Sequence, residues 1–180
     1  MANHEIKPHS MLLIASLLAL SACDDAGTKP LKGSTSVLGG KASIVLPEGY
    51  VKMPQKMLET KFPQGNRPQE AWYLKSEDGK VTIAFKSTDQ AVRESQISQM
   101  SEGMKQQLRM FNPVVTDVTV NGRKMSRMEM TTPSLDGEIF NVAQISSMDN
   151  KMLISSFSVP KNLKETYEKG GKDALSTLTY

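Results

Sequence analysis

Methionine is the residue type that stands out as a source of chemistry in this sequence. The chain holds 12 methionines, and two pairs, Met53 with Met57 and Met100 with Met104, are spaced by four residues. On a helix this spacing places two thioethers on one face, and soft thioethers are ligands that Cu(I) prefers. Methionine is also a flexible apolar side chain that fills buried stripes. The sequence therefore predicts packing positions first, with a methionine-based copper site as the alternative.

Most other catalytic and metal sites lack the residues that they need. The two histidines, His4 and His9, precede an apolar leader-like run, and the one cysteine is Cys23. We therefore expect no histidine-supported catalysis, no histidine-bound metal and no cofactor in the domain that follows. The motifs GxxxxGK[ST] and GxGxxG are absent, and the net charge is only +3. Neither nucleotide nor nucleic-acid binding is predicted.

Two kinds of hydrolytic site stay open as alternatives. Ser158 and Lys161 have the S-x-x-K spacing of a Ser–Lys pair, but the companion S-D-N and K-T-G elements are missing, and Pro160 interrupts the helical turn that the pair requires. Chance is the favoured explanation of this match. The second candidate is a pair of carboxylates drawn from four acids in or beside predicted turns, where carboxylates are ordinarily solvated: Glu77, Asp78, Asp136 and Glu138. A carboxylate-dependent periplasmic hydrolase is the function that such a pair would support.

The single cysteine lies at the end of an export signal. Residues 11–20 (MLLIASLLAL) are an unbroken apolar run, and a helix of this length reaches about 15 Å, half of a bilayer core. Residues 1–22 are therefore read as a signal peptide and not as a membrane span. Leu20-Ser21-Ala22-Cys23 resembles the lipobox of bacterial lipoproteins, which implies cleavage before Cys23 and its acylation. An ordinary secretory peptide that ends near a cysteine is the alternative.

The residues after Cys23 predict where the protein resides. In enteric-type lipoproteins, an Asp directly after the modified cysteine resembles the signal for inner-membrane retention, and here Asp24 and Asp25 follow. Two solvated acids that open a linker are the alternative. Residues 23–36 lack apolar periodicity and are predicted to be a flexible tether. Four lysines near the C-terminus could face lipid headgroups, although interleaved acids favour a solvated helix face: Lys161, Lys164, Lys169 and Lys172.

Residues 37–180 form one predicted α+β domain with an antiparallel sheet flanked by helices. A strand is expected over residues 41–46, and helices are expected within 91–110 and over 162–177, the latter weakest at Gly170-Gly171. Three strand pairs are expected around Asp78-Gly79, Asn121-Gly122 and residues 148–151. Their strands span residues 71–75 with 81–86, 114–120 with 123–131, and 139–147 with 152–159.

The order of these features resembles the DcrB family of inner-membrane lipoproteins. The resemblance rests on Leu-Ser-Ala-Cys-Asp-Asp at residues 20–25, Gly-Lys-Ala-Ser-Ile-Val-Leu-Pro at 40–47, and a strand with Trp72 that leads into Asp-Gly-Lys at 78–80. It covers nearly the whole chain and implies a PsbP-like fold. It also implies a link to bacteriophage adsorption or envelope maintenance, and it supplies no catalytic residues.

The features together predict a non-enzymatic lipoprotein of the bacterial inner membrane. Its lipid anchor is acylated Cys23, and several acyl chains on one residue suffice for stable attachment to the bilayer. The domain is expected to face the periplasm and to bind an envelope protein as an adaptor, because tethering raises the effective concentration of weak contacts.

Overall fold

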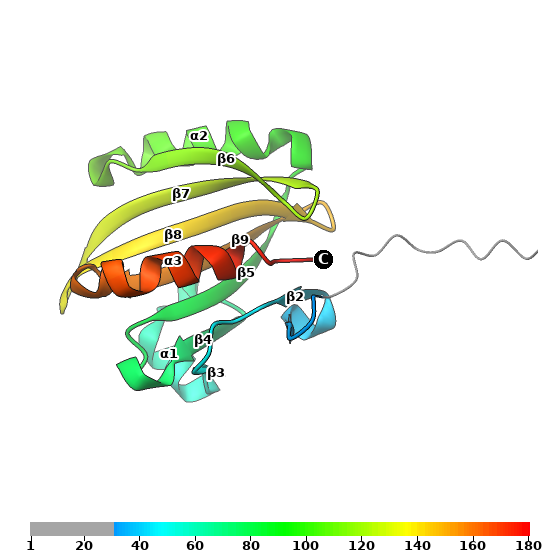
Figure 1. The fold of residues 1–180 in the computed structure, drawn as a ribbon. Helices are drawn as coiled ribbons and strands as arrows, with labels where there is room; N and C mark the ends of the chain where they lie inside the picture. The colour runs from blue at the N-terminus through cyan, green and yellow to red at the C-terminus, as the bar shows by residue number, and fades with distance from the viewer. Residues whose placement is uncertain (1–30) are drawn as a thin grey trace, which may run out of the picture.

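The computed structural model describes residues 31–180, which form a seven-stranded antiparallel sheet, a small two-stranded sheet and three helices (Figure 1). The main sheet has the order β3-β4-β5-β9-β8-β7-β6. None of the helices in this part of the chain is long and apolar enough to cross a membrane. In chain order the elements are β1 (Thr35–Val37), β2 (Ala42–Ile44), β3 (Tyr50–Lys52), α1 (Gln55–Lys61), β4 (Glu70–Leu74), β5 (Thr82–Ala91), α2 (Ile97–Gln107), β6 (Val114–Val120), β7 (Arg123–Ser134), β8 (Gly137–Met148), β9 (Lys151–Pro160) and α3 (Lys164–Leu175).

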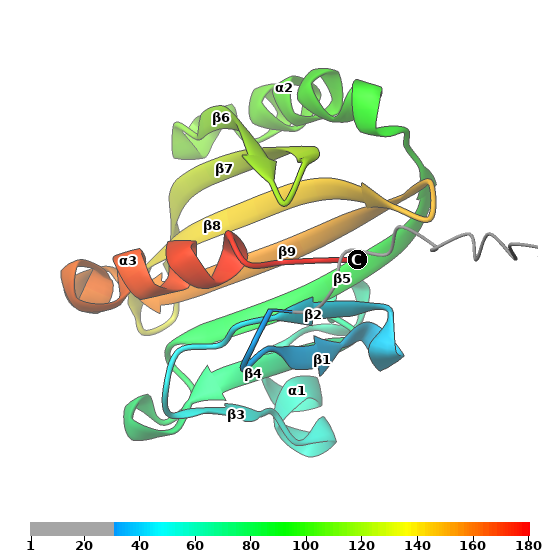
Figure 2. The same ribbon diagram turned by 45° about the vertical axis from the view of Figure 1, so that its right-hand side comes forward.

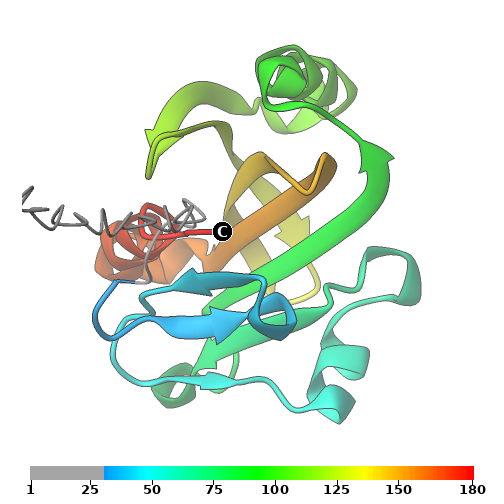
Figure 3. The same cartoon turned by 90° about the vertical axis from the view of Figure 1, so that its right-hand side faces the viewer.

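The helices divide between the two faces of the main sheet. α3 and the β1–β2 pair pack on one face, and α1 and α2 lie on the other, over different halves of the sheet (Figures 2 and 3). Successive side chains of a strand point to opposite faces, so neighbouring residues serve different cores. In β9, for example, Leu153 and Phe157 pack towards α3, whereas Met152 packs towards α2. The central strands are therefore buried on both faces.

The strand pairs around Asp78-Gly79, Asn121-Gly122 and residues 148–151 are confirmed. Asn121 and Gly122 both have positive φ, 49° and 80°, which matches the right-handed twist of the flanking strands β6 and β7. The Asn121 amide also donates to the carbonyl oxygen of Leu178 at 2.9 Å. This turn is therefore joined to the C-terminal segment as well as to its own strands.

Both predicted helices are present, and the second continues through its two glycines. α2 places Ile97, Met100 and Met104 against the core on its side of the sheet, as its apolar stripe predicts. α3 includes Gly170 and Gly171, of which Gly171 is buried. A Cβ at Gly171 would overlap the ring of Phe157, so this glycine permits close approach of α3 to β9.

Three features of the fold were not predicted. No sequence pattern predicts α1 or β3, and β1 already includes Thr35 and Ser36, which belong to the predicted tether. The largest difference is the strand order: β5 pairs with β9, not with the next strand in sequence. α2 carries the chain from β5 to the far edge, where β6 begins, and three successive hairpins then return to the centre.

Candidate functional site

A groove of about 760 Å³ lies on the sheet face that carries α1. It lies between the C-terminal end of α1, the β4–β5 turn, the β7–β8 hairpin and the connection from β9 to α3. Its volume falls within the range of small-ligand and peptide-segment pockets. The lining residues are Lys61, Phe62, Lys80, Thr82, Thr132, Ser134, Asp136, Ile139, Asn141, Ser158, Pro160, Asn162 and Leu163.

The floor of the groove is a polar row across three central strands. Strand register places Thr82 of β5 beside Ser158 of β9, and Ser158 beside Asn141 of β8. The Ser158 hydroxyl donates to Asn141 Oδ1 at 2.8 Å, and Asn141 Nδ2 donates to Thr132 Oγ1 at 3.0 Å. Asn141 also donates to the carbonyl oxygen of Ile139 at 3.0 Å, so its amide is held by several partners. The floor is therefore a polar surface whose side chains are held in place by hydrogen bonds to one another.

The walls combine apolar surface with charge. Phe62 directly follows α1 and packs into the cluster beneath that helix, while Ile139, Pro160 and Leu163 line the groove from the other elements. Burial lowers the pKa of Lys61, and the carboxylate of Asp136 partly offsets this shift. The wall thus has a partly desolvated ammonium group on one side.

The Ser158–Lys161 pair is not brought together in the described residues. The Ser158 hydroxyl is occupied by Asn141, and Lys161 Nζ is 2.7 Å from Glu138 Oε2. Pro160 lies between them at the end of β9, where the chain has extended geometry. The spacing that suggested a nucleophile and its base therefore corresponds to two residues with separate partners.

The candidate carboxylates are also dispersed. Glu77 accepts a hydrogen bond from the Tyr167 hydroxyl at 2.6 Å, and Glu138 is paired with Lys161, whereas Asp136 lies at the groove. Asp78 occupies a turn with a φ of 50°. Within residues 31–180 no group of three His, Cys, Asp or Glu side chains is arranged to hold a metal ion.

The four candidate methionines fall into two separate apolar clusters. Met53 and Met57 pack beneath α1 against β4 and β5, and Met100 and Met104 pack between α2 and the other half of the sheet. Met53 is buried, with 5% exposure, and the other three are half-buried. This placement favours the packing interpretation, because no four-thioether site is assembled.

The lysines near the C-terminus are engaged on the protein surface. Each forms an ion pair with a neighbouring acid, which favours the solvated-face interpretation over lipid contact. The pairs are Lys161–Glu138, Lys164–Glu168, Lys169–Asp173 and Lys172 with both Glu129 and Glu168. The predicted lipidation residue Cys23 and the predicted sorting residues Asp24 and Asp25 lie outside the described residues.

Sequence reasoning singled out Ser158 and Asp136 for other chemistry and missed the rest of the groove, because the groove depends on which strands are neighbours. Thr82, Asn141 and Ser158 are polar residues at inward-facing strand positions, and that was the available signal. Their proximity needs the β5–β9 and β9–β8 registers, which no local pattern contains. Lys61 was overlooked together with α1.

Comparison with known proteins establishes the fold. No family model matches the sequence, and no curated protein matches it. The cyanobacterial PsbP protein CyanoP from Synechocystis sp. PCC 6803 is structurally similar, with a TM-score of 0.53 and 10% identity over 89% of this chain and 99% of that one. LpqN of Mycobacterium tuberculosis, described as involved in cell envelope biogenesis, gives a TM-score of 0.47 and 8% identity over 77% of this chain and 82% of that one. The domain therefore has a PsbP-like α+β fold, as expected from the sequence.

Proposed function

We propose that this protein is a non-enzymatic lipoprotein of the DcrB type, anchored in the bacterial inner membrane through acylated Cys23, whose periplasmic domain binds an envelope protein through the groove. Its process would be envelope maintenance or the membrane step of phage adsorption. The observation that supports the proposal is the position of the groove at the end of the domain away from β1, the first strand of the described residues.

The two ends of the domain are well separated. β1 and β2 lie beside the C-terminus (Figure 2), where Ser43 of β2 bridges to Thr179. The Asn121-Gly122 turn is at this end as well, because Asn121 bonds to Leu178. β7 then runs for 12 residues to the hairpin that borders the groove. At 3.4 Å per residue this strand spans roughly 40 Å.

The tether and the groove thus face different surroundings. The predicted tether of about a dozen residues would reach about 20 Å on average, so a domain attached at the β1 end would stay close to its membrane. The groove at the other end would then be open to proteins of the periplasm or to the outer portions of membrane complexes. Confinement at the membrane raises the effective concentration of such partners.

Site-specific cross-linking in living cells tests this proposal. A photo-cross-linking residue replaces Asn162 at the groove, and a matched control replaces Lys169, an exposed residue on α3. We expect a discrete cross-linked protein from position 162 and not from 169, and a marked loss of that product in a Cys23→Ser background. Equal products from both positions, or none from the groove with Cys23 confirmed as acylated, would reject the proposal.

A further inference from the structure

Two lysines line the groove without forming a direct ion pair. Lys61 comes from the end of α1 and Lys80 from the β4–β5 turn, and neither forms an ion pair in the described part of the chain. The nearby Lys161 differs, because Glu138 neutralises it at 2.7 Å. Asp136 is the one carboxylate among the residues that line the groove. The groove therefore has an excess of positive charge.

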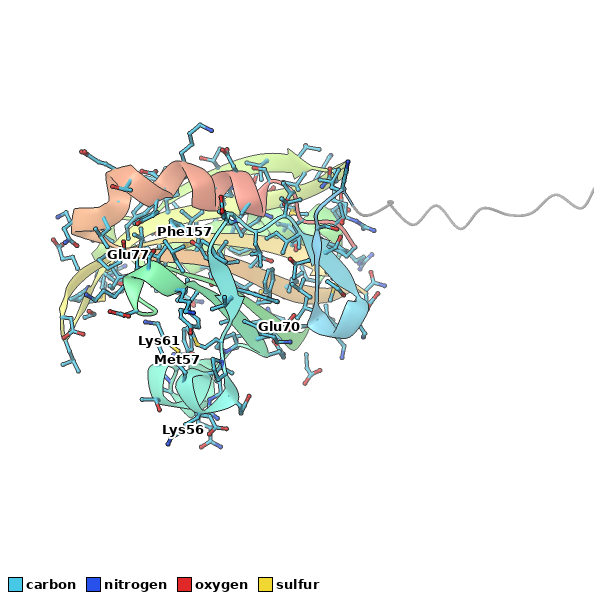
Figure 4. All side chains as sticks on the ribbon, turned by 60° about the horizontal axis from the view of Figure 1, so that its bottom comes forward. Lys56, Met57, Lys61, Glu70, Glu77 and Phe157 are labelled. Atoms are coloured by element: carbon cyan, nitrogen blue, oxygen red, sulfur yellow. The ribbon has the colours of Figure 1, made fainter. Side chains whose placement is uncertain are left out.

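Lys61 is the more informative of the two because its environment disfavours its charge. It projects from α1 towards the sheet, whereas Lys56 on the same helix points away (Figure 4). Its pKa is lowered because burial removes water from the ammonium group, and Asp136 compensates only in part. An incoming anion would supply the missing counter-charge. Desolvation also strengthens each charge-assisted hydrogen bond formed there.

The neutral groups of the groove add donors to this charge. Thr132 accepts from Asn141, so its own hydroxyl proton is available, and Thr82 adds a second hydroxyl to the lining of the groove. Backbone carbonyl and carboxylate oxygens of a ligand would satisfy such donors. The apolar surfaces of Phe62 and Leu163 offer contacts for side chains between them. An extended peptide presents this combination of groups.

From this charge complementarity we propose that the groove recognises an extended acidic peptide segment, with Lys61 and Lys80 binding a side-chain carboxylate and the polar floor binding the peptide backbone. The inference rests on the proposed function, for which it names the chemistry of the partner.

Peptide binding to the full-length lipoprotein in nonionic detergent tests the inference by fluorescence anisotropy. The probe is a labelled ten-residue peptide with three glutamates separated by Ala and Val, and its matched control has glutamine at those positions. We expect Lys61→Met and Lys80→Met each to weaken binding of the acidic peptide about fivefold, the effect of roughly 1 kcal/mol for a partly exposed charge pair. Lys56→Met is the matched surface variant and should leave binding unchanged.

Several results would overturn the inference. Equal affinity for the glutamate and glutamine peptides would show that charge is not recognised, and an equal effect of Lys56→Met would show diffuse attraction. Vesicles of phosphatidylglycerol that compete through the same two lysines, in the absence of peptide binding, would assign the site to lipid headgroups. Urea denaturation of each variant separates loss of binding from loss of folding.

A direct readout distinguishes recognition from a structural role of Lys61. The pKa of Lys61, measured by NMR, should rise when the acidic peptide is added, because the peptide carboxylate favours the charged amine. An unchanged pKa at saturation would contradict the inference. If cross-linking from position 162 succeeds while acidic peptides fail to bind, the result supports the proposed function and rejects the inference that the groove recognises acidic peptides.

Discussion

Gly170 and Gly171 of α3 provide a test of how closely this helix packs on β9, because alanine at the two positions should change the free energy of unfolding in opposite directions. At Gly170 a Cβ would have Pro47 Cγ as its nearest neighbour, at 4.0 Å, which is ordinary contact. Gly170→Ala should therefore stabilise the protein by about 0.5–1 kcal/mol through helix propensity. At Gly171 the same methyl group would overlap three ring carbons of the fully buried Phe157.

The cost at Gly171 exceeds the gain in helix propensity. Overpacking of a filled core costs about 1–3 kcal/mol, and an overlap with a fully buried ring belongs to the upper part of that range, about 2–3 kcal/mol. We expect Gly171→Ala to lower the free energy of unfolding by about 1–2 kcal/mol after the propensity gain of about 1 kcal/mol is included. The two variants should thus differ by about 1.5–3 kcal/mol.

Urea denaturation followed by far-ultraviolet circular dichroism measures this difference. With a slope of about 2 kcal/mol per molar urea, the two unfolding midpoints should be about 1 M apart, on opposite sides of the unmodified protein. Equal midpoints, or a Gly171→Ala variant as stable as Gly170→Ala, would refute the close approach of α3 to β9.

Three further expectations concern other parts of the fold. Burial raises the pKa of Tyr50 above its ordinary value of 10.0, so the Tyr50 hydroxyl ionises at lower pH in the unfolded chain than in the folded protein. The stabilising contribution of the neutral hydroxyl is therefore present below pH 10.0 and is lost as the pH rises further. In urea titrations, the free energy of unfolding should fall less between pH 8 and about pH 11 for Tyr50→Phe than for the unmodified protein. Asn121→Ala should cost about 1–2 kcal/mol by calorimetry, because alanine disfavours positive φ and the 2.9 Å bond to Leu178 is lost; an unchanged melting temperature would contradict this. Met100→Leu with Met104→Leu should reduce stability by less than about 1.5 kcal/mol per site and leave Cu(I) retention in a competition titration unaltered; loss of copper with the fold intact would support the copper alternative.

Local signals explain which parts of the fold could be predicted. The Asn121-Gly122 turn is determined by two adjacent residues, and the stripe of α2 by a spacing within one helix. α1 has only seven residues and no recognisable stripe, whereas the predicted packing role of Met53 and Met57, for which a copper-ligand pair was the alternative, agrees with their place in the cluster beneath that helix. A short helix with little sequence signal is held by its tertiary contacts.

Non-local pairing explains what sequence reasoning missed. The polar floor exists because Thr82 and Ser158 become neighbours across β5 and β9, although they are far apart in the chain. The same limit applies to Gly171, which looked like a weak point of its helix and is instead required by the ring of Phe157. Helix propensity describes the isolated segment, whereas close packing depends on the partner strand.

The pairing of β5 with β9 also affects the order in which the chain folds. Within residues 31–180, β6 to β9 form consecutive hairpins with short-range closure, whereas β3 to β5 join the main sheet through β9, its last strand. Closing that long loop carries an entropic cost, so we expect the hairpins to form early and the β5–β9 contact to be the slow step. Until β9 is available, the amino-terminal strands expose unpaired edges and depend on protection from aggregation.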